Sequence, residues 1–315
     1  MTQYIVRRLI HSVFIVWGCA TLVFFMIRLI PGDPVLQMLG PEYTPEAAEA
    51  LRHKLGLDQP IYVQYLKWFS SVLRGDLGDS IATGETVVGA IKTGFPKTLS
   101  ITVLSFLIAL AIALPAGIVA ALRRNSVIDY LVSILAFAGV SMPGFWFGII
   151  LIILFAVQLR WLPAVGYASL TQDGFWPWLS HLLLPSLAVG TGYAAILMRF
   201  VRAGLLEVLG MDYVRTARAK GLAEWTVIAR HALRNALIPV VTVAGIQLAL
   251  LLSGTVVIET VFSIRGLGRI LVGAIFDKDY PIVQGVILLI AVIFVMANLI
   301  VDIIYTFLDP RIRYG

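Results

Sequence analysis

Few residues in this sequence have the types and spacing that catalysis requires. Its four histidines are His11, His53, His181 and His231. They are far apart in the chain, and no H-E-x-x-H pattern would place two zinc ligands on one helix face. The run Gly139-x-Ser141-Met-Pro-Gly144 resembles a nucleophile elbow, but its second glycine comes one position late and it lies in an apolar stretch. Hydrolysis by a metal or by an activated serine is therefore not supported.

Two further patterns fail as cofactor sites. Gly84 and Gly89 have the spacing that opens a phosphate-binding loop, yet Lys92 and Thr93 follow two residues too late. The single cysteine, Cys19, lies in an apolar run and has no partner for an internal disulfide or a thiolate metal site. We therefore expect no metal, no cofactor and no ATP site in this chain itself.

Charged and polar residues within apolar stretches are the remaining candidates. Arg28 is close to the end of the first stretch, where its side chain can extend to lipid headgroups. Asp302, one turn after Asn298, is expected to pair with or cap a neighbouring helix. No series of acidic and histidine residues crosses the membrane, which weakens a proton-coupled carrier. Four polar residues of the fifth stretch could line a water-filled path or form interhelical hydrogen bonds, namely Thr242, Gln247, Ser253 and Thr255.

The segment 201–235 has a different pattern. Its Arg and Lys residues alternate with Ala, Leu, Val and Ile, which predicts two short amphipathic helices hinged near Gly221. One interpretation is a basic surface held against anionic lipid headgroups. The other is a docking surface for a protein, because the segment also has a well-formed apolar side.

The composition identifies the elements that must position these residues. The chain is 59% hydrophobic and 13% charged, with a mean hydropathy of +0.92. Soluble domains are about 45–50% apolar and about 25% charged, so the excess apolar surface must face lipid. The net charge of +6 would suggest nucleic acid in a soluble protein. Here the basic residues cluster beside apolar stretches, so orientation in the bilayer explains them better and no nucleic acid is expected.

An all-α membrane protein with six spans follows from the apolar stretches, since about 20 residues cross the hydrocarbon core. The predicted spans are Leu9–Ile30, Leu99–Leu122, Leu131–Leu159, Trp176–Phe200, Ala236–Ile258 and Ile282–Leu308. The third and sixth are long enough to tilt or kink, and Pro143 lies inside the third. Gly144 and Gly148 mark close helix packing. The first stretch lacks a cleavage site after a short apolar core and is read as a retained span.

The distribution of basic residues predicts the orientation. With the N-terminus inside, the inner ends and loops hold 13 of the 24 Lys and Arg residues, and the C-terminus is also inside. The outer loop 31–98 mixes six basic with eight acidic residues. It should contain a helix with Thr44 as its cap and Pro45 at its first position that ends at Gly56, then a second helix over Val63–Leu73. The apolar run Ile270–Phe276 is too short to span and should lie at the interface or dip inward.

One family resemblance rests on residues 212–239. The two matching stretches of sequence are Asp212-Tyr-Val-Arg-Thr-Ala-Arg-Ala-Lys-Gly221-Leu and Arg230-His-Ala-Leu-Arg-Asn-Ala-Leu-Ile-Pro239. This resembles the cytoplasmic "EAA" loop in permease subunits of bacterial dipeptide and oligopeptide ABC importers. Gly221 takes the glycine of that motif and Leu233 the leucine, while Arg215-Thr216-Ala217 replaces E-A-A. His231 and Arg234 replace its isoleucine and proline. The resemblance implies that these residues are usual at these positions in the peptide-importing members of the family.

Other segments extend the resemblance to nearly the whole chain and indicate the first of two paired permeases. They are Tyr4–Leu9, Pro31-Gly-Asp-Pro34, Gly56–Pro60, Gly75–Gly78, Gly266–Gly268, Asp279–Pro281 and Leu308-Asp-Pro-Arg-Ile-Arg-Tyr314. The resemblance implies a type I ABC importer permease fold in which residues 1–315 form one transmembrane domain. It implies a location in the bacterial inner membrane.

The same resemblance implies the partners: a second permease, two cytoplasmic ATPases that bind ATP and magnesium, and an extracytoplasmic binding protein. It places the ATPase-coupling role on Arg215, Thr216, Ala217, Lys220, Gly221 and Leu222. Dipeptides or oligopeptides are the expected cargo, with glutathione, nickel complexes or other small solutes as alternatives. The residues that contact cargo stay unassigned. An ion-gradient-driven carrier would instead predict internal repeats and charged residues at mid-membrane. An intramembrane enzyme would need a set of catalytic residues close together.

Overall fold

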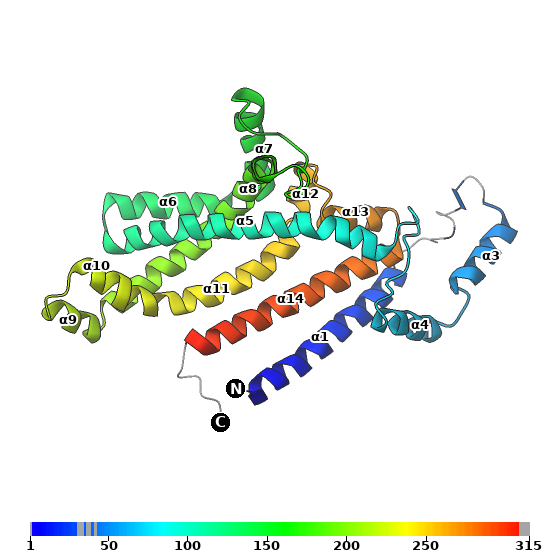
Figure 1. Ribbon diagram of the computed structural model, residues 1–315, viewed down its shortest axis with the longest axis horizontal. Coiled ribbons are helices and arrows are strands. Elements are labelled where there is room, and N and C mark those ends of the chain that lie inside the picture. The colour runs from blue at the N-terminus through cyan, green and yellow to red at the C-terminus, as the bar shows by residue number, and fades with distance from the viewer. Residues whose placement is uncertain (1, 30–34, 36–38, 41–42, 309–315) are drawn as a thin grey trace. The chain divides into compact units, whose positions relative to one another are not determined.

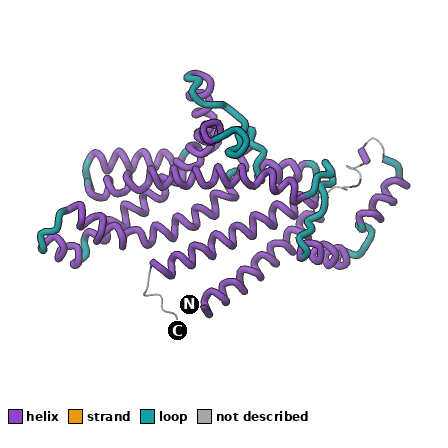
Figure 2. Tube along the Cα trace, viewed as in Figure 1, coloured by secondary structure: helices purple, strands orange, loops and turns teal. Residues whose placement is uncertain are grey.

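The structure is a computed structural model that describes residues 2–29, 35, 39–40 and 43–308. Within that part of the chain the regular elements are helices, and one isolated antiparallel bridge joins Asp79 and Thr86 (Figure 2). The motif at 31–34 and most of the C-terminal motif, 309–314, lie outside the described residues, as do the side chains of Ser253 and Asp302.

The chain divides into two compact units. Unit 1 is built on Thr98–Ile264, and unit 2 on Val6–Lys97 and Arg265–Val295. The long helices α5 and α14 contribute to both units. A division into compact units says nothing about whether they act as one membrane domain, so the single domain over 1–315 stays a prediction.

The helices of unit 1 follow one another with short connections, apart from the longer one at 159–174 between η2 and α8 (Figure 1). They are α5 (Val87–Leu122, from Thr98), α6 (Val127–Ser141), α7 (Gly144–Leu151), η2 (Ile152–Gln158), α8 (Phe175–Leu209), α9 (Asp212–Ala219), α10 (Glu224–Thr226), η3 (Val227–Ala232), α11 (Leu233–Gly254) and α12 (Val256–Val261). Those of unit 2 are α1 (Thr2–Leu29), α3 (Pro45–Leu55), α4 (Ile61–Leu73), the start of α5, α13 (Leu267–Phe276) and the first part of α14 (Tyr280–Leu308).

The span prediction holds with one correction. Five described helices are long and apolar enough to cross a membrane, and a bent pair makes six if it is one span. That pair is the predicted third span, which turns by 103° between Ser141 and Gly144. The cause is Pro143, which lacks an amide hydrogen and forces the residue before it out of helical geometry. Met142 accordingly has φ −84° and ψ 126°, in the extended region.

Two helices extend past the ends of the predicted spans. Helix α5 begins at Val87, before the predicted second span, and α8 continues to Leu209, past the predicted fourth span, while the loop bounds 31–98 and 201–235 stay predictions. A span predicted from apolar residues ends where charged residues begin, whereas the helix itself continues until a residue that disfavours helical geometry. Gly210 ends α8 in this way.

The helices of the outer loop confirm the predicted caps. The Thr44 hydroxyl accepts a hydrogen bond from the Ala47 amide at 3.2 Å, and Pro45 is the first residue of α3. Gly56 ends α3 with φ 66°, a left-handed conformation that suits glycine. The second predicted helix is α4, which starts two residues early at Ile61.

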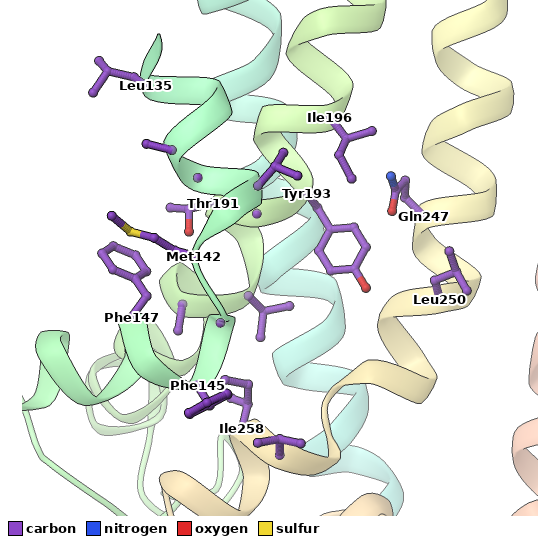
Figure 3. A pocket seen from close by; sticks show the side chains of 18 residues that line it. Leu135, Met142, Phe145, Phe147, Thr191, Tyr193, Ile196, Gln247, Leu250 and Ile258 are labelled. Carbon is purple, nitrogen blue, oxygen red and sulfur yellow. The ribbon is translucent and has the colours of Figure 1, made fainter. Parts of the chain in front are cut away.

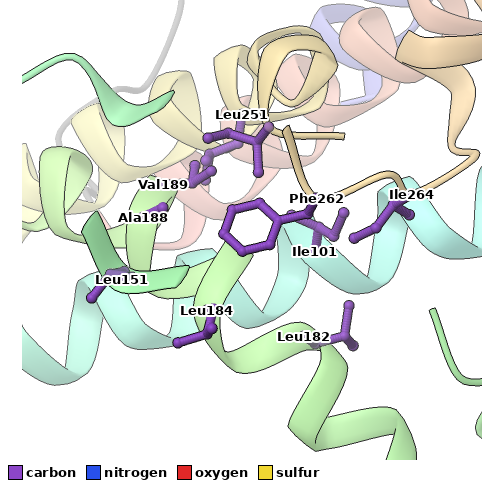
Figure 4. Packing of buried hydrophobic residues seen from close by; sticks show 10 residues of the cluster. Ile101, Leu151, Leu182, Leu184, Ala188, Val189, Leu251, Phe262 and Ile264 are labelled. Carbon is purple, nitrogen blue, oxygen red and sulfur yellow. The ribbon is translucent and has the colours of Figure 1, made fainter. Parts of the chain in front are cut away.

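Unit 1 is organised around α8, which packs against α6, α7 and α11. Small residues permit this contact, because a Cβ on Gly204 would lie 2.7 Å from the Ala236 carbonyl oxygen. Gly144 and Gly148 face Ala188 of α8, which confirms the predicted close packing. Figure 4 shows a buried cluster in which the Phe262 ring is surrounded by aliphatic side chains of α5, α8 and α11.

Candidate functional site

The inner segment, residues 210–232, is built from α9, the turn at Gly221, α10 and η3. Val214 and Ala217 of α9 are buried in a cluster with Leu205, Val227 and Ala236. They lie three residues apart and therefore share one face of the helix. This apolar face packs against the chain's own helices, so the segment is firmly attached to unit 1.

The opposite side of the segment is exposed. The Arg215 side chain is 74% exposed, and Thr216, Lys220 and Gly221 are also at the surface. Leu222 is 40% exposed. Of the six residues assigned to ATPase coupling, five therefore lie on an accessible surface, and Ala217 lies beneath it.

A left-handed turn connects α9 to α10. Gly221 has φ 76°, and a Cβ added there would meet nothing within 4 Å. Across this turn Arg218 donates to both carboxylate oxygens of Glu224, at 3.1 and 2.6 Å. These hydrogen bonds raise the pKa of the Arg218 guanidinium above its ordinary value. Asn235 donates to the Tyr213 hydroxyl at 2.8 Å and joins α9 to the start of α11.

Sequence reasoning missed one residue of this surface. Trp225 follows the turn and is 77% exposed, although tryptophan normally buries most of its ring. Exposed aromatic residues are typical anchors of protein interfaces. The signal was present in the sequence as a tryptophan among the basic residues of this segment, just after the Gly221 turn.

Asp129 and Arg202 form a second feature, near the start of α6 and the C-terminal part of α8. Arg202 Nε and a terminal guanidinium nitrogen each donate to a separate Asp129 oxygen at 2.7 Å. The Asn125 amide donates to the same carboxylate at 3.0 Å, and Ser126 caps α6 by accepting from the Asp129 amide. The Asp129 side chain is 4% exposed. The pair therefore fixes the start of α6 to α8, a role that the sequence did not predict for either residue.

A pocket of about 750 Å³ opens in unit 1 beside the break between α6 and α7 (Figure 3). Its lining is mainly apolar, and Tyr193 of α8 and Gln247 of α11 extend toward the space between their helices. Among the described residues that line it, none is Asp, Glu, Lys or Arg. Ser141, considered above as a nucleophile, donates to the Phe137 carbonyl at 2.9 Å and is not activated by a base.

The polar residues of the fifth span have different roles. Gln247 lines the pocket, which favours the water-filled path for that residue. The Thr242 hydroxyl points to the Ile238 carbonyl of its own helix. Thr255 donates at 3.0 Å to Glu259, which also accepts from Thr98 at 2.6 Å. The Glu259 side chain is fully buried and joins α12 to α5, although it directly follows the predicted fifth span.

Arg28 in unit 2 does not extend away from the protein as expected. Its guanidinium lies 3.5 Å from the centroid of the Phe24 ring. Arg28 also donates to the Gln64 side chain at 3.2 Å and to the Phe24 carbonyl at 3.0 Å. The charge is therefore held between α1 and α4 by a cation–π contact and two hydrogen bonds.

Comparison with known proteins identifies the family. Residues 113–314 match the binding-protein-dependent transport system inner membrane component, and residues 1–102 match the N-terminal part of such membrane components. The chain belongs to this family. It is a multi-pass inner-membrane permease subunit of an ABC importer, and not itself an enzyme.

Curated relatives match over the full length. The chain is 41% identical to the probable peptide ABC transporter permease protein y4tP of Sinorhizobium fredii, with all of both chains covered. It is 44% identical to the di/tripeptide transport system permease protein DppB of Pseudomonas aeruginosa, covering 100% of this chain and 99% of the relative. It is 42% identical to the glutathione transport system permease protein GsiC of Escherichia coli K12, again with complete coverage.

Solved structures confirm the fold. Two crystal forms of the inward-facing methionine ABC transporter MetNI match with TM-scores of 0.56 and 0.57, at 20% and 21% identity. Each match covers 70% of this chain and 96% of the other. The chain thus has the type I ABC importer permease fold.

Proposed function

We propose that this permease forms half of the pathway of a dipeptide or oligopeptide importer, and that the inner segment couples it to cytoplasmic ATPases. The observation that carries the proposal is the construction of that segment. Val214 and Ala217 attach α9 to unit 1, while Arg215, Lys220 and Leu222 remain exposed around the Gly221 turn. A rigid attachment with an exposed contact surface can transmit a displacement from a partner to the membrane helices.

The proposed partners are a second, related permease, two ATPase subunits that bind ATP and magnesium, and an extracytoplasmic binding protein. ATP binding would bring the two ATPases together and move the inner segments with them. The Asp129–Arg202 pair would make α6 move with α8, which lines one side of the pocket. Transport then follows from the different affinities of the inward- and outward-facing states for the loaded binding protein and the nucleotide.

The proposed orientation has both termini in the cytoplasm. Support comes from the 13 basic residues at the inner ends and loops, because positively charged loops are retained on the cytoplasmic side. The inner segment, with its four Arg and Lys residues at 215–220 and 230, would then face the ATPases. The helices α3 and α4 would lie on the extracytoplasmic side.

Peptide cargo is supported by the relatives that carry peptides, and glutathione by the GsiC relative. Nickel complexes or other small solutes are further alternatives. The pocket favours broad cargo, since apolar walls with Tyr193 and Gln247 offer neutral hydrogen bonds and no fixed charge. A pathway of this kind does not retain one solute tightly, so the binding protein would select the cargo.

Reconstitution tests the function directly. The tagged chain is purified with its accompanying subunits, placed in proteoliposomes with the binding protein, and supplied with labelled dipeptide, glutathione or nickel. We expect dipeptide accumulation that requires ATP and is unaffected by a proton ionophore. Uptake of glutathione or nickel alone would replace the peptide cargo. Uptake that follows a proton gradient without ATP would contradict the importer and favour the secondary carrier.

A further inference from the structure

Helix α4 has three distinct faces. One face carries Tyr65, Trp68 and Gln64, which are partly buried. A second face carries apolar side chains at intervals of three and four residues, and these are Tyr62, Leu66, Phe69 and Leu73. The third face carries polar side chains, namely Lys67, Ser70, Ser71 and Arg74 at the cap. A helix with one face packed on protein needs only one apolar stripe, so the second stripe requires a separate explanation.

The first face packs against α1. The Tyr65 hydroxyl lies 3.0 Å from Trp17 Nε1 and 2.8 Å from the Thr21 hydroxyl. Its ring stacks on Phe25, and the Trp68 ring lies 5.2 Å from the ring of Phe24. Figure 1 shows α4 next to the C-terminal part of α1. These contacts determine which side of α4 is covered by protein.

The depth of these contacts is informative. Helix α1 contains a candidate membrane span that ends at Leu29. Thr21 precedes that end by about 12 Å of helix rise, and Trp17 by about 18 Å. Because Tyr65 contacts both of these residues, α4 lies beside the apolar length of α1 and not beyond its end. The helix therefore shares the depth of the bilayer edge.

Three of the four side chains on the second face are strongly exposed at this depth, and Phe69, which stacks on Tyr65, is partly buried. Tyr62 is 64% exposed, Leu66 62% and Leu73 73%. On α1, against which α4 packs, Trp17, Met26 and other apolar side chains are also exposed, as expected for lipid contact. Lys67 and Arg74 on the polar face are suited to phosphate headgroups.

We infer that α4 is an in-plane membrane anchor whose occupant is the lipid bilayer. Its apolar stripe lies among the acyl chains near the outer end of α1, and its polar face meets the headgroups and water. Aromatic residues are favoured at this level because their rings tolerate both environments. The anchor holds the connection between α3 and α5 at the membrane surface. Only the identity of the leaflet rests on the proposed orientation.

Site-directed spin labelling tests the anchor. The chain has a single cysteine, so Cys19→Ser provides a background for one label at a time. The full-length protein, with its accompanying subunits, is placed in lipid nanodiscs after labelling at Leu66→Cys. Collisions with oxygen, which partitions into acyl chains, are compared with collisions with a water-soluble nickel chelate. We expect an oxygen-to-nickel ratio at Leu66 roughly threefold or more above that at Lys67→Cys, the matched position on the polar face.

Two controls define the range. Val13→Cys on α1, where the native side chain is 67% exposed, supplies the lipid value, and Leu73→Cys repeats the test on the same stripe if the Leu66 variant does not assemble. A label at Leu66 that favours nickel would show water on this face. A label shielded from both reagents would show a protein partner. Either result overturns the anchor, and neither measurement depends on transport activity.

Discussion

Two ion pairs in unit 1 have the same bidentate geometry but differ in how far their side chains are exposed to solvent. Asp129 and Arg202 join two helices far apart in the chain, with side chains 4% and 29% exposed. Arg218 and Glu224 close one turn, with side chains 40% and 55% exposed. Both guanidinium groups bind both oxygens of their carboxylate partner.

The difference in exposure separates their roles. In a shielded environment a charge without its partner is costly, so breaking the pair destabilises the protein strongly. In water the same contact is screened and contributes little. The first pair therefore holds the start of α6 on α8, while the second adds little to the stability of the turn at Gly221.

Breaking the shielded pair should have the largest effect on stability. Asp129→Ala leaves the Arg202 guanidinium near an apolar surface and removes the acceptor of the Asn125 amide. We expect a loss on the order of 2 kcal/mol in unfolding free energy, reduced from the value for a fully buried pair because Arg202 is partly exposed. A lower thermal midpoint of the purified permease in detergent measures the loss.

The double variant Asp129→Leu with Arg202→Met is the matched control. It removes both charges and keeps apolar volume, so most of the lost stability should return. If the double variant is as unstable as Asp129→Ala, the charge pair does not explain the effect.

Substitution at Gly221 should act on coupling more than on stability. Gly221→Trp adds bulk to the proposed contact surface in a left-handed turn, and open space around the Cβ prevents an internal clash. We expect ATP hydrolysis to persist while peptide uptake falls about tenfold, which corresponds to about 1.4 kcal/mol of lost docking. Parallel ATPase and uptake assays in proteoliposomes measure the two activities.

Gly221→Asn is the control for that prediction. Asparagine tolerates a positive φ better than other side chains and is much smaller than tryptophan. Uptake by the asparagine variant should stay near the unmodified level. Normal uptake by Gly221→Trp would contradict the coupling role assigned to this turn.

Removal of the exposed pair should have the smallest effect. Arg218→Ala breaks the contact with Glu224 where both side chains are in water, so the thermal midpoint should not change measurably. Comparing melts at low and high salt sharpens the contrast, because screening weakens exposed pairs most. A drop as large as that of Asp129→Ala would show that exposure does not separate the two pairs.

Local patterns in the sequence were sufficient for much of the fold. Thr44 and Gly56 predicted both ends of α3, because caps depend on neighbouring backbone groups. The glycines at 144 and 148 predicted close packing with a neighbouring helix. The boundary of α8 was not predictable from apolar counting, since its last nine residues continue the helix after the apolar run ends.

The candidate site divides in the same way. The two short helices of the inner segment and the hinge at Gly221 were predictable from alternating basic and apolar residues. This pattern is local, because it extends over only a few turns of helix. The sequence did not predict that Val214 and Ala217 are buried, because their partners Leu205 and Ala236 belong to other helices. The carboxylate of Glu259 and the pocket beside Tyr193 gave no local signal, because their partners come from other helices.

The sequence by itself therefore determined that the chain enters a membrane, roughly where its helices cross and which inner segment is exposed. These properties depend on hydrophobicity and on residues close in the chain. Only the tertiary structure decided the pairing of Asp129 with Arg202 and the contact of Glu259 with Thr98. Both are outcomes of long-range packing, in which residues 73 positions apart meet because α6 and α8 lie side by side.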